Sequence, residues 1–489
     1  MTGRNYINGQ WTKASGQPFS AVNPATGTTT WTGNSSDLSD VNTAVAAARA
    51  ATGEWRNTTI VDRIKIIERF GELVKAASEE LGAIITRETG KPLWESKTEA
   101  GAMAGKVAVS VAAHMERGGT TVQQLADAAS ITRHRPLGVL AVLGPYNFPG
   151  HLPNGHIVPA LVAGNTVVFK PSELTPGTAE FTLRLWDEAG LPAGVLNLVQ
   201  GAADTGRTLS AHEGIDGLLF TGSVSTGRIL HAQFAGHPEK MLALELGGNN
   251  PLVVREVENV DAALLMTIQS SYLSAGQRCT CARRLFVPNG AWGDCFVDRL
   301  VTSIHGIKVG DPASLDQPFI GPVVSTKAAN AMVKAQTRLV ELGGVPLVEL
   351  KHLDPATGFV SPGLIDVTDA HDLPDEEYFG PLLQLTRYDL FDEAIDGAND
   401  TQFGLAAGLL SDDAAEYELF LTEVDAGVIN WNRPTTGAAS SAPFGGVGAS
   451  GNHRPGAYYA VDYVTHPVAS METTELVLPD KLPPGVSLG

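Results

Sequence analysis

The sequence predicts an α/β protein built around a doubly wound parallel sheet. Between Leu137 and Leu244, short apolar runs alternate with longer amphipathic stretches, as strands alternate with helices in such folds. A second α/β region follows Asn250. The chain has 489 residues and 43% of them are hydrophobic, so it is long enough for two or three domains and too apolar to be disordered throughout.

The expected elements follow the chain in order. The first 56 residues predict turns with a short strand near Tyr6, and apolar residues spaced by three or four between Ile60 and Ile84 predict a helix that ends before Gly90 and Pro92. The first sheet is expected to contain strands at 137–143, 166–170, 195–199, 217–220 and 241–244, with a helix at 178–189. The second region is expected to contain strands at 284–287, 382–388 and 427–430, with helices at 261–274 and 328–343. Two segments fit neither region: 120–135, and the tail from Tyr458, which begins with a predicted strand at 458–465.

Composition limits the class of protein. The chain provides 34 Lys and Arg against 53 Asp and Glu, a net charge of −19, so we expect no nucleic-acid partner, although a few arginines suffice for a small anion. The longest stretch without acidic or basic side chains, 136–169, contains several prolines, so we expect no membrane span. The first residues lack the apolar segment of a signal peptide, and three cysteines cannot staple so long a chain, so we expect a cytoplasmic protein.

Polar side chains follow the first two predicted strands, at the edge of the sheet where ligands bind. Asn147 lies between two prolines, and its amide could donate to a developing oxyanion or could satisfy the backbone of a turn. Lys170 and Glu173 lie where a nucleotide sugar would bind, although Glu173 could equally cap the next helix.

The fourth predicted strand leads into Gly222-Ser-Val-Ser-Thr-Gly227. Glycine and serine at the start of a helix can present backbone N–H groups to a phosphate. The Gly-x4-Gly spacing matches neither the dinucleotide fingerprint nor a P-loop, so an ordinary turn remains the alternative.

Two further residues could carry chemistry. Glu245 precedes two glycines at the end of the fifth predicted strand and could be a general base, or a solvated or paired carboxylate. Cys279 lies in a glycine-containing loop beside Arg278, and these features expose a thiol and lower its pKa, although a buried structural cysteine is the alternative. With Cys281 it offers too few ligands for zinc, and a disulfide across one residue would be strained, so we expect no metal.

Together and in this order, the segments resemble those of the NAD(P)-dependent aldehyde dehydrogenase superfamily. The matching pieces are PYNFP, FKPSE, FTGSVSTG, LELGGNNP, GQRCT, EEYFGP and PFGGVGASG. They run from residue 145 to residue 451, and the N-terminal INGQW and NPATG also fit, so the resemblance covers nearly the whole chain.

The resemblance implies a role for individual residues. Cys279 matches the nucleophile, Glu245 the general base and Asn147 the oxyanion donor. NAD would be held by Lys170 and Glu173 at the adenosine ribose, by Gly222, Ser223, Val224, Ser225, Thr226 and Gly227 at the pyrophosphate, and by Glu377 and Phe379 at the nicotinamide ribose. The thiolate would attack the aldehyde, hydride would leave the thiohemiacetal, and Glu245 would activate the water that hydrolyses the resulting thioester.

Three features resemble the members of this family that oxidise a semialdehyde with two carboxylates in arginine catabolism. His151 stands where many relatives have a bulky apolar group, Arg278 precedes the nucleophile, and Arg433 lies shortly before PFGG. Arginine suits carboxylate recognition, so we expect these residues to bind the substrate. The alternatives are an intrachain salt bridge for Arg433 and loop packing for Arg278. Another carboxylated semialdehyde such as succinate semialdehyde, acyl transfer to coenzyme A, and a catalytically silent protein on the same fold are the rival functions.

The resemblance also implies three structural parts. Residues 1–119 and 137–246 would form a Rossmann-like NAD-binding domain, and 247–447 a second α/β domain that carries Cys279. Residues 120–136 and 448–489 would form a β oligomerisation arm and tail, which implies a homodimer or a dimer of dimers.

Overall fold

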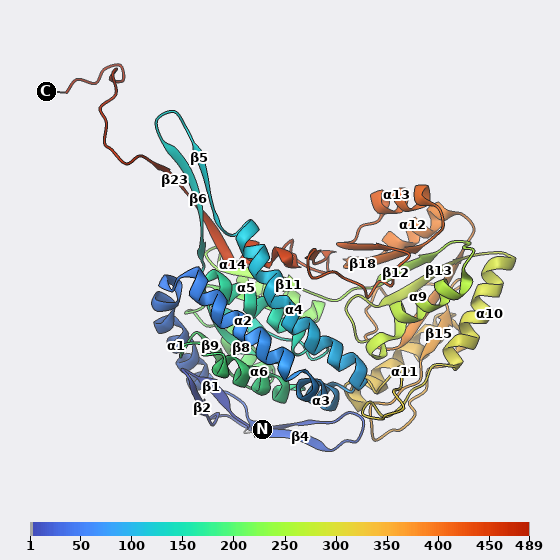
Figure 1. The fold of residues 1–489 in the computed structure, drawn as a ribbon. Helices are drawn as coiled ribbons and strands as arrows, with labels where there is room; N and C mark the ends of the chain where they lie inside the picture. The colour runs from blue at the N-terminus through green and yellow to red at the C-terminus, as the bar shows by residue number, and fades with distance from the viewer. Residues whose placement is uncertain (1–2, 489) are drawn as a thin grey trace.

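The computed structural model describes residues 3–488 and contains two seven-stranded sheets and a smaller sheet that projects from the body (Figure 1). The ends of the predicted domain ranges, residues 1–2 and 489, lie outside the described residues. The first sheet has the order β11-β10-β7-β8-β9-β1-β2, and its first five strands are parallel. Its strands are β1 (Asn5–Ile7), β2 (Gln10–Thr12), β7 (Val139–Leu143), β8 (Thr166–Lys170), β9 (Leu196–Leu198), β10 (Gly217–Thr221) and β11 (Met241–Glu245).

The predicted strands of the first sheet are confirmed within two residues at their ends. All residues of β7, β8, β9 and β10 are buried, as expected for parallel strands that helices cover on both faces. The strand order reverses between β7 and β10, and the crevice at such a reversal is where doubly wound sheets bind ligands. The covering helices are α1 (Leu38–Asn57), α2 (Ile60–Ala76), α3 (Ser78–Thr89), α4 (Leu93–Arg117), α5 (His151–Ala163), α6 (Pro176–Glu188), α7 (Ala203–Ser210) and α8 (Val224–Phe234).

The helices correct the sequence prediction in two places. The first 56 residues are not only turns, because α1 begins at Leu38 behind a capping box in which Asp37 accepts from the backbone and Asp40 accepts in return. Its buried face is made largely of alanine and valine, which gave a weak apolar signal. The single helix predicted from Ile60 is two helices, since the chain turns at Ala77 and the apolar spacing continues across the break.

The second large sheet has the order β14-β15-β16-β13-β12-β18-β19. Its strands are β12 (Asn250–Val254), β13 (Ala282–Pro288), β14 (Val345–Val348), β15 (Gly363–Asp366), β16 (Leu382–Tyr388), β18 (Ala406–Leu410) and β19 (Val428–Trp431). Its helices are α9 (Val260–Tyr272), α10 (Ala291–His305), α11 (Thr326–Glu341), α12 (Phe391–Asn399) and α13 (Ala414–Glu423). Every strand and helix predicted for this region is present. β16 has the predicted range, the other elements have shifted ends, and α9 stops two residues earlier than predicted.

The projecting sheet joins distant parts of the chain. The hairpin of β5 (Thr120–Gln124) and β6 (Ala129–Pro136) pairs with β23 (Thr465–Glu472), so the two segments that fitted neither region lie side by side (Figure 1). The strand predicted at 458–465 is wrong. That segment is a 3₁₀ turn (Tyr458–Ala460) and the short helix α14 (Val461–Val464), because its buried residues contact α4 and α5 with helical rather than alternating spacing.

Two short antiparallel pairs and a two-stranded ribbon complete the described elements. The ribbon is β3 (Pro18–Val22) with β4 (Thr29–Asn34), and the pairs are β17 (Phe403–Gly404) with β21 (Val447–Gly448) and β20 (Pro443–Phe444) with β22 (Gly456–Ala457). None of the helices in residues 3–488 is both long and apolar enough to cross a membrane.

Candidate active site

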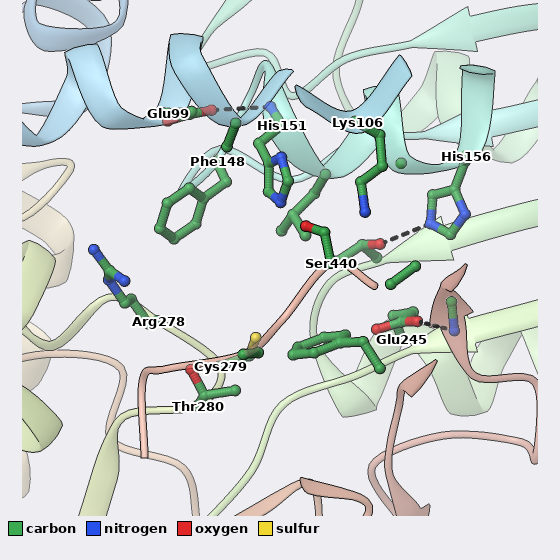
Figure 2. A pocket seen from close by; sticks show the side chains of 18 of the residues that line it. Glu99, Lys106, Phe148, His151, His156, Glu245, Arg278, Cys279, Thr280 and Ser440 are labelled. Carbon is green, nitrogen blue, oxygen red and sulfur yellow. Dashed lines mark hydrogen bonds between the residues drawn. The ribbon is translucent and has the colours of Figure 1, made fainter. Parts of the chain in front are cut away.

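A pocket of about 340 Å³ lies between the first sheet, helices α4 and α5, and the loop that carries Cys279 (Figure 2). Glu245 and Cys279 both line it, as do His151 and Arg278. The sequence therefore predicted four residues that the fold brings to one cavity. The segment from Thr436 to Phe444 also lines the pocket, with small residues such as Ala438 and Ala439.

The loop before Cys279 has an unusual backbone. After α9 ends at Tyr272, Ser274, Ala275 and Gly276 have φ angles of 55°, 53° and 71° in succession. Left-handed residues other than glycine cost roughly 1 kcal/mol or more each, and they persist where the surroundings enforce them. Here the Asn250 side-chain amide donates to the carbonyls of Cys279 at 2.7 Å and Cys281 at 2.8 Å.

The electrostatics of the thiol differ from the sequence expectation. Burial, followed by the nearby carboxylates of Glu377 and Glu245, raises the pKa of Cys279 to about 12. The lowered pKa expected from Arg278 is wrong, because burial dominates at Cys279 and the Arg278 guanidinium is paired with Glu95 at 2.6 Å. The thiol is therefore protonated at neutral pH and must lose its proton during any attack.

Glu245 ends β11 and faces the same pocket. Its carboxylate accepts a hydrogen bond from the backbone N–H of Gly456 at 3.0 Å (Figure 2). Burial raises its pKa to about 8, and the bond from Gly456 and the charge of Lys106 partly oppose that rise. A carboxyl group with this pKa can accept and release a proton near neutral pH, which is what a general base requires.

Asn147 follows β7 and lies against the cysteine loop. Its amide nitrogen donates to the carbonyl of Gln277 at 3.0 Å, and only 7% of the residue is exposed. It is absent from the residues that line the described pocket. An amide has a second N–H, so this position still allows one donor toward the neighbourhood of Cys279.

The predicted adenosine-side residues lie around the ends of β8 and β10. Lys170 donates to the carbonyl of Gly201 at 2.8 Å, and burial lowers its pKa to about 8. Glu173 is half-buried in the loop before α6. Ser223 caps α8 by accepting from the backbone N–H of Thr226, and Ser225 and Thr226 are exposed at the start of that helix.

Glu377 lies near the cysteine, and Phe379 packs against Tyr146 and Arg283. Burial raises the pKa of Glu377 to about 7, with Arg283 3.9 Å away opposing the rise, and its Oε1 is buried without a hydrogen-bond partner. A Cβ on Gly247 would lie 1.8 Å from this carboxylate, so only glycine leaves room for it. An unpartnered buried carboxylate oxygen fits a ribose hydroxyl group, which would supply the missing donor.

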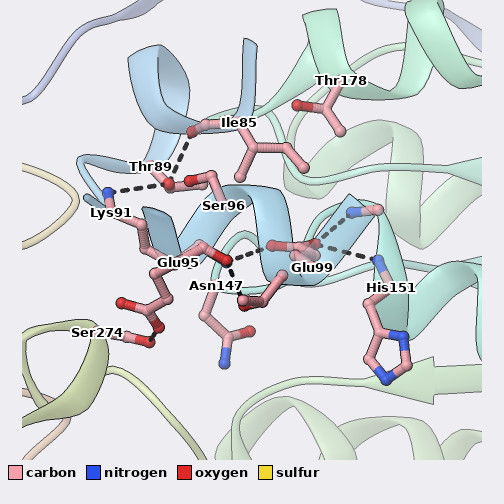
Figure 3. A network of polar contacts seen from close by, with 12 residues as sticks. Ile85, Thr89, Lys91, Glu95, Ser96, Glu99, Asn147, His151, Thr178 and Ser274 are labelled. Atoms are coloured by element: carbon pink, nitrogen blue, oxygen red, sulfur yellow. Dashed lines mark hydrogen bonds and ion pairs between the residues drawn. The ribbon is translucent and has the colours of Figure 1, made fainter. Parts of the chain in front are cut away.

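A buried polar network holds the helical side of the pocket (Figure 3). Glu99 of α4 pairs with Lys91 and accepts from the backbone N–H groups of Gly150 at 2.9 Å and His151 at 3.1 Å. A carboxylate at the start of α5 is favourable because it meets unpaired N–H groups and the positive end of the helix dipole. This network fixes α4 against α5.

Comparison with known proteins decides the family. The model of the aldehyde dehydrogenase family matches residues 11–469. The chain belongs to the aldehyde dehydrogenase family. Among curated proteins, it is 58% identical over 481 residues to one of Burkholderia vietnamiensis and 57% identical to one of Burkholderia ambifaria. Both are named N-succinylglutamate 5-semialdehyde dehydrogenase, and each match covers 98% of this chain and 99% of the relative.

Solved aldehyde dehydrogenases share the fold over almost the full length. An indole-3-acetaldehyde dehydrogenase of P. syringae, described in complex with NAD+ and IAA, has a TM-score of 0.91 at 29% identity, with 96% of both chains covered. An E. coli structure described as an NADP dependent enzyme has a TM-score of 0.90 at 31% identity, covering 96% of this chain and 98% of that one. The α/β fold of aldehyde dehydrogenases, implied by the sequence resemblance, is confirmed by these structures.

Of the three predicted substrate-binding residues, Arg433 is the one that does not line the pocket of this aldehyde dehydrogenase. It is exposed just after β19, where Asn432 turns with a φ of 52°, and the chain enters the pocket only from Thr436 onward. Within residues 3–488, Arg433 has neither an ion pair nor a side-chain hydrogen bond, so the alternative of a salt bridge fails as well.

Helix α4 contributes residues to the pocket that the sequence motifs did not reveal. Thr98, Glu99, Ala102 and Lys106 line the cavity from this helix. Their spacing of three and four residues places them on one face, and this pattern was visible in the sequence. No family motif includes them, so nothing marked that face as part of the site.

Proposed function

We propose that this aldehyde dehydrogenase oxidises N-succinyl-L-glutamate 5-semialdehyde to N-succinyl-L-glutamate with NAD, as a step of arginine catabolism. The observation that carries the proposal is that Cys279 and Glu245 face one pocket that the cationic residues Lys106 and Arg278 also line. The relatives that are 57–58% identical over almost the whole chain carry the name of this activity.

In the proposed reaction, the Cys279 sulfur attacks the aldehyde carbon. Glu245 is close enough to raise the thiol pKa, and its own pKa of about 8 lets it take the thiol proton. The second N–H of Asn147 and the backbone N–H of Cys279 would hold the oxyanion of the thiohemiacetal. Losing one such donor typically costs about 3 kcal/mol of transition-state stabilisation.

Loss of hydride from the thiohemiacetal carbon leaves a thioester on Cys279. Bound NAD supplies the hydride acceptor for this step. Glu245 then removes a proton from water, and the resulting nucleophile hydrolyses the thioester to the free acid. The pocket therefore needs one base that acts twice, and the raised pKa of Glu245 suits both transfers.

For the cofactor, we propose the residues that the family resemblance implied. Lys170 and Glu173 would contact the adenosine ribose, Gly222 to Gly227 the pyrophosphate, and Glu377 with Phe379 the nicotinamide ribose. The exposed N-terminus of α8 and the unpartnered Oε1 of Glu377 support this assignment. A carboxylate at Glu173 would repel a 2′-phosphate, so we expect a higher kcat/KM for NAD than for NADP.

The assembly and domains are also proposals. The two large sheets would be the cores of the NAD-binding and catalytic domains, and the projecting sheet would form the interface of a homodimer or a dimer of dimers. One of its two edge strands, β5, is exposed along its whole length, and an unpaired edge invites pairing with another chain. We further propose a cytoplasmic location, without a nucleic-acid or membrane partner.

The proposal is tested by turnover of aldehydes with zero, one and two carboxylates. We expect the highest kcat/KM for N-succinylglutamate 5-semialdehyde, with NADH and free N-succinylglutamate as products. Better turnover of succinate semialdehyde would favour that alternative substrate. If an acyl-coenzyme A product forms when coenzyme A is added, the second step is acyl transfer to coenzyme A rather than hydrolysis. No NADH from any of these aldehydes would contradict the enzyme assignment.

A further inference from the structure

Helix α4 carries a lysine whose amino group points into the pocket. Lys106 lines the cavity together with Glu245 and Cys279, although the residue as a whole is only 3% exposed (Figure 2). In the close view its amino group lies between His151 and His156, on the side of the pocket opposite Cys279. Its side chain thus runs through packed protein and ends at the cavity.

The packing of α4 on α5 fixes this course. The side-chain amide of Asn154 donates to the carbonyl of Met103 at 3.1 Å, which ties the two helices together one turn before Lys106. A Cβ placed on Gly155 would lie 3.8 Å from Cε of Lys106, so the lysine side chain runs past α5 at Gly155, where α5 has no side chain. The amino group is therefore positioned by the scaffold rather than by a polar partner.

The other cationic groups near the pocket already have partners. Arg278 pairs with Glu95 at 2.6 Å and lies 5.1 Å from the centre of the Phe148 ring. Lys91 pairs with Glu99. Within residues 3–488, Lys106 makes neither an ion pair within 4.0 Å nor a side-chain hydrogen bond.

The two histidines beside Lys106 do not supply a charge. Burial, with nearby cations, lowers the pKa of His151 to about 3 and that of His156 to about 4, so both are neutral at pH 7. His156 is bonded to Tyr463 at 2.9 Å and to Thr221 at 3.1 Å. Nδ1 of His151 is buried without a partner.

An ammonium group in such surroundings is costly unless it is paired. Burial lowers the pKa of Lys106 to about 8, and the charge of Glu245 partly opposes that fall. Glu245 lies beyond ion-pair distance and takes its hydrogen bond from Gly456 instead. A carboxylate that enters the pocket would give Lys106 the partner that the chain itself does not provide.

We propose that Lys106 is the specificity-determining residue that binds a carboxylate of the substrate inside the pocket. This inference rests on the proposed function, because it explains how the pocket distinguishes a carboxylated semialdehyde from a neutral aldehyde. Arg278, which is paired with Glu95, then contributes to the wall of the pocket. The neutral His151 offers a hydrogen bond rather than a charge.

The test replaces the charge while keeping the length of the side chain. Lys106→Met should lower kcat/KM for N-succinylglutamate 5-semialdehyde by about 10- to 150-fold, mostly through KM, as expected for the loss of a charge-assisted hydrogen bond. A neutral aldehyde of similar length should keep kcat/KM within about twofold. Lys97→Met is the matched control on α4, since Lys97 pairs with Glu79 at the surface. This control should leave kcat/KM unchanged for both the carboxylated and the neutral aldehyde.

Comparison of substrates identifies the carboxylate. The N-acetyl analogue keeps only the α-carboxylate. If Lys106→Met lowers kcat/KM for this analogue as much as for the N-succinyl substrate, Lys106 binds the α-carboxylate. If kcat/KM for the analogue does not fall, Lys106 binds the carboxylate of the succinyl end. Equal loss on charged and neutral aldehydes, or a shift of the pH profile for the neutral aldehyde, would overturn the proposal. Those results would mean that Lys106 acts through Glu245 or through folding.

A binding measurement keeps the test independent of turnover. Calorimetry with N-succinyl-L-glutamate on Cys279→Ala should show that adding Lys106→Met weakens binding by a similar factor, and equal affinities would overturn the inference. If the wild-type protein prefers another carboxylated aldehyde, the proposed function fails. The inference about Lys106 is then supported if Lys106→Met lowers kcat/KM for that carboxylated aldehyde and not for the neutral one, and it is overturned otherwise.

Discussion

The two sides of the pocket are built in different ways. The reactive side consists of Cys279 and Glu245, one in a strained loop and the other at a strand end. The helical side consists of residues of α4 and α5, fixed by the network of Glu99 and Glu95. The residues of the reactive side lie in the motifs by which the sequence resembles the family, whereas no such motif contains the α4 residues of the helical side.

This difference separates the residues that carry out the reaction from those that determine which aldehyde is bound. A strand end or loop holds a group by its backbone, so a short motif is enough to define it. A helix contributes one face with residues three or four apart, and no short motif contains such a set. We therefore expect changes on the reactive side to affect all aldehydes alike, and changes on the helical side to depend on the substrate or on stability.

The largest effect is expected at the nucleophile. Cys279→Ala removes the only proposed attacking group and should reduce NADH formation by more than about 1,000-fold on every aldehyde, while NAD binding persists. Steady-state turnover and NAD titration measure the two properties. Cys295→Ser is the control, because Cys295 is exposed and outside the pocket. A dead Cys281→Ala with an active Cys279→Ala would reverse the assignment.

The next effect concerns the base and its pH dependence. Glu245→Gln should strongly lower steady-state turnover, because the thioester is no longer hydrolysed efficiently. In the wild-type protein the base must be deprotonated, so the rate of hydrolysis should rise with pH through about 8 and level off above it. Stopped-flow measurement of NADH across pH checks this, and a hydrolysis rate that falls between pH 6 and 8 would contradict it.

A change on the helical side should affect stability rather than chemistry. Glu95→Ala leaves Arg278 without its partner, and breaking a buried ion pair in this way costs about 3–5 kcal/mol. We expect a lower Tm in thermal unfolding, whereas Glu95→Gln, which keeps a hydrogen-bond acceptor, should lose less. An unchanged Tm for Glu95→Ala would show that this contact contributes nothing to the α4 side of the pocket.

The smallest effect is expected at Arg433. This residue is exposed and outside the pocket lining, so Arg433→Ala should change kcat/KM by no more than about twofold on either charged or neutral aldehydes. A selective loss on the dicarboxylated semialdehyde would instead place Arg433 at the mouth of the pocket.

The sequence was informative where residues act locally. The five strands of the first sheet were predicted from apolar runs. Glu245 and Cys279, which line one cavity, were singled out by a strand end, a glycine-containing loop and the family motifs. The pKa of Cys279 was not, because the adjacent Arg278 is turned toward Glu95, almost two hundred residues earlier in the chain. The place of Lys106 depends in the same way on how α4 packs against α5.

Two further segments were hard to predict: helix α1, which buries small apolar residues, and the helical turns that directly precede β23. The alanines of α1 bury against the sheet without a strong hydrophobic signal. Residues Tyr458–Ala460 and Val461–Val464 look strand-like because they are β-branched and aromatic, but they pack as helical turns before β23 begins. Tertiary contacts, which the local sequence does not contain, decided both cases.

Trapping the covalent intermediate tests the central claim that Cys279 and Glu245 act as a pair on this substrate. Glu245→Gln, mixed with NAD and N-succinylglutamate 5-semialdehyde and quenched with acid, should give one burst of NADH, slower than in the wild-type protein because Glu245 no longer takes the thiol proton. Peptide mass spectrometry should then find the N-succinylglutamyl group on Cys279. A burst without this adduct, an adduct on Cys281, or undiminished steady-state turnover would contradict the account.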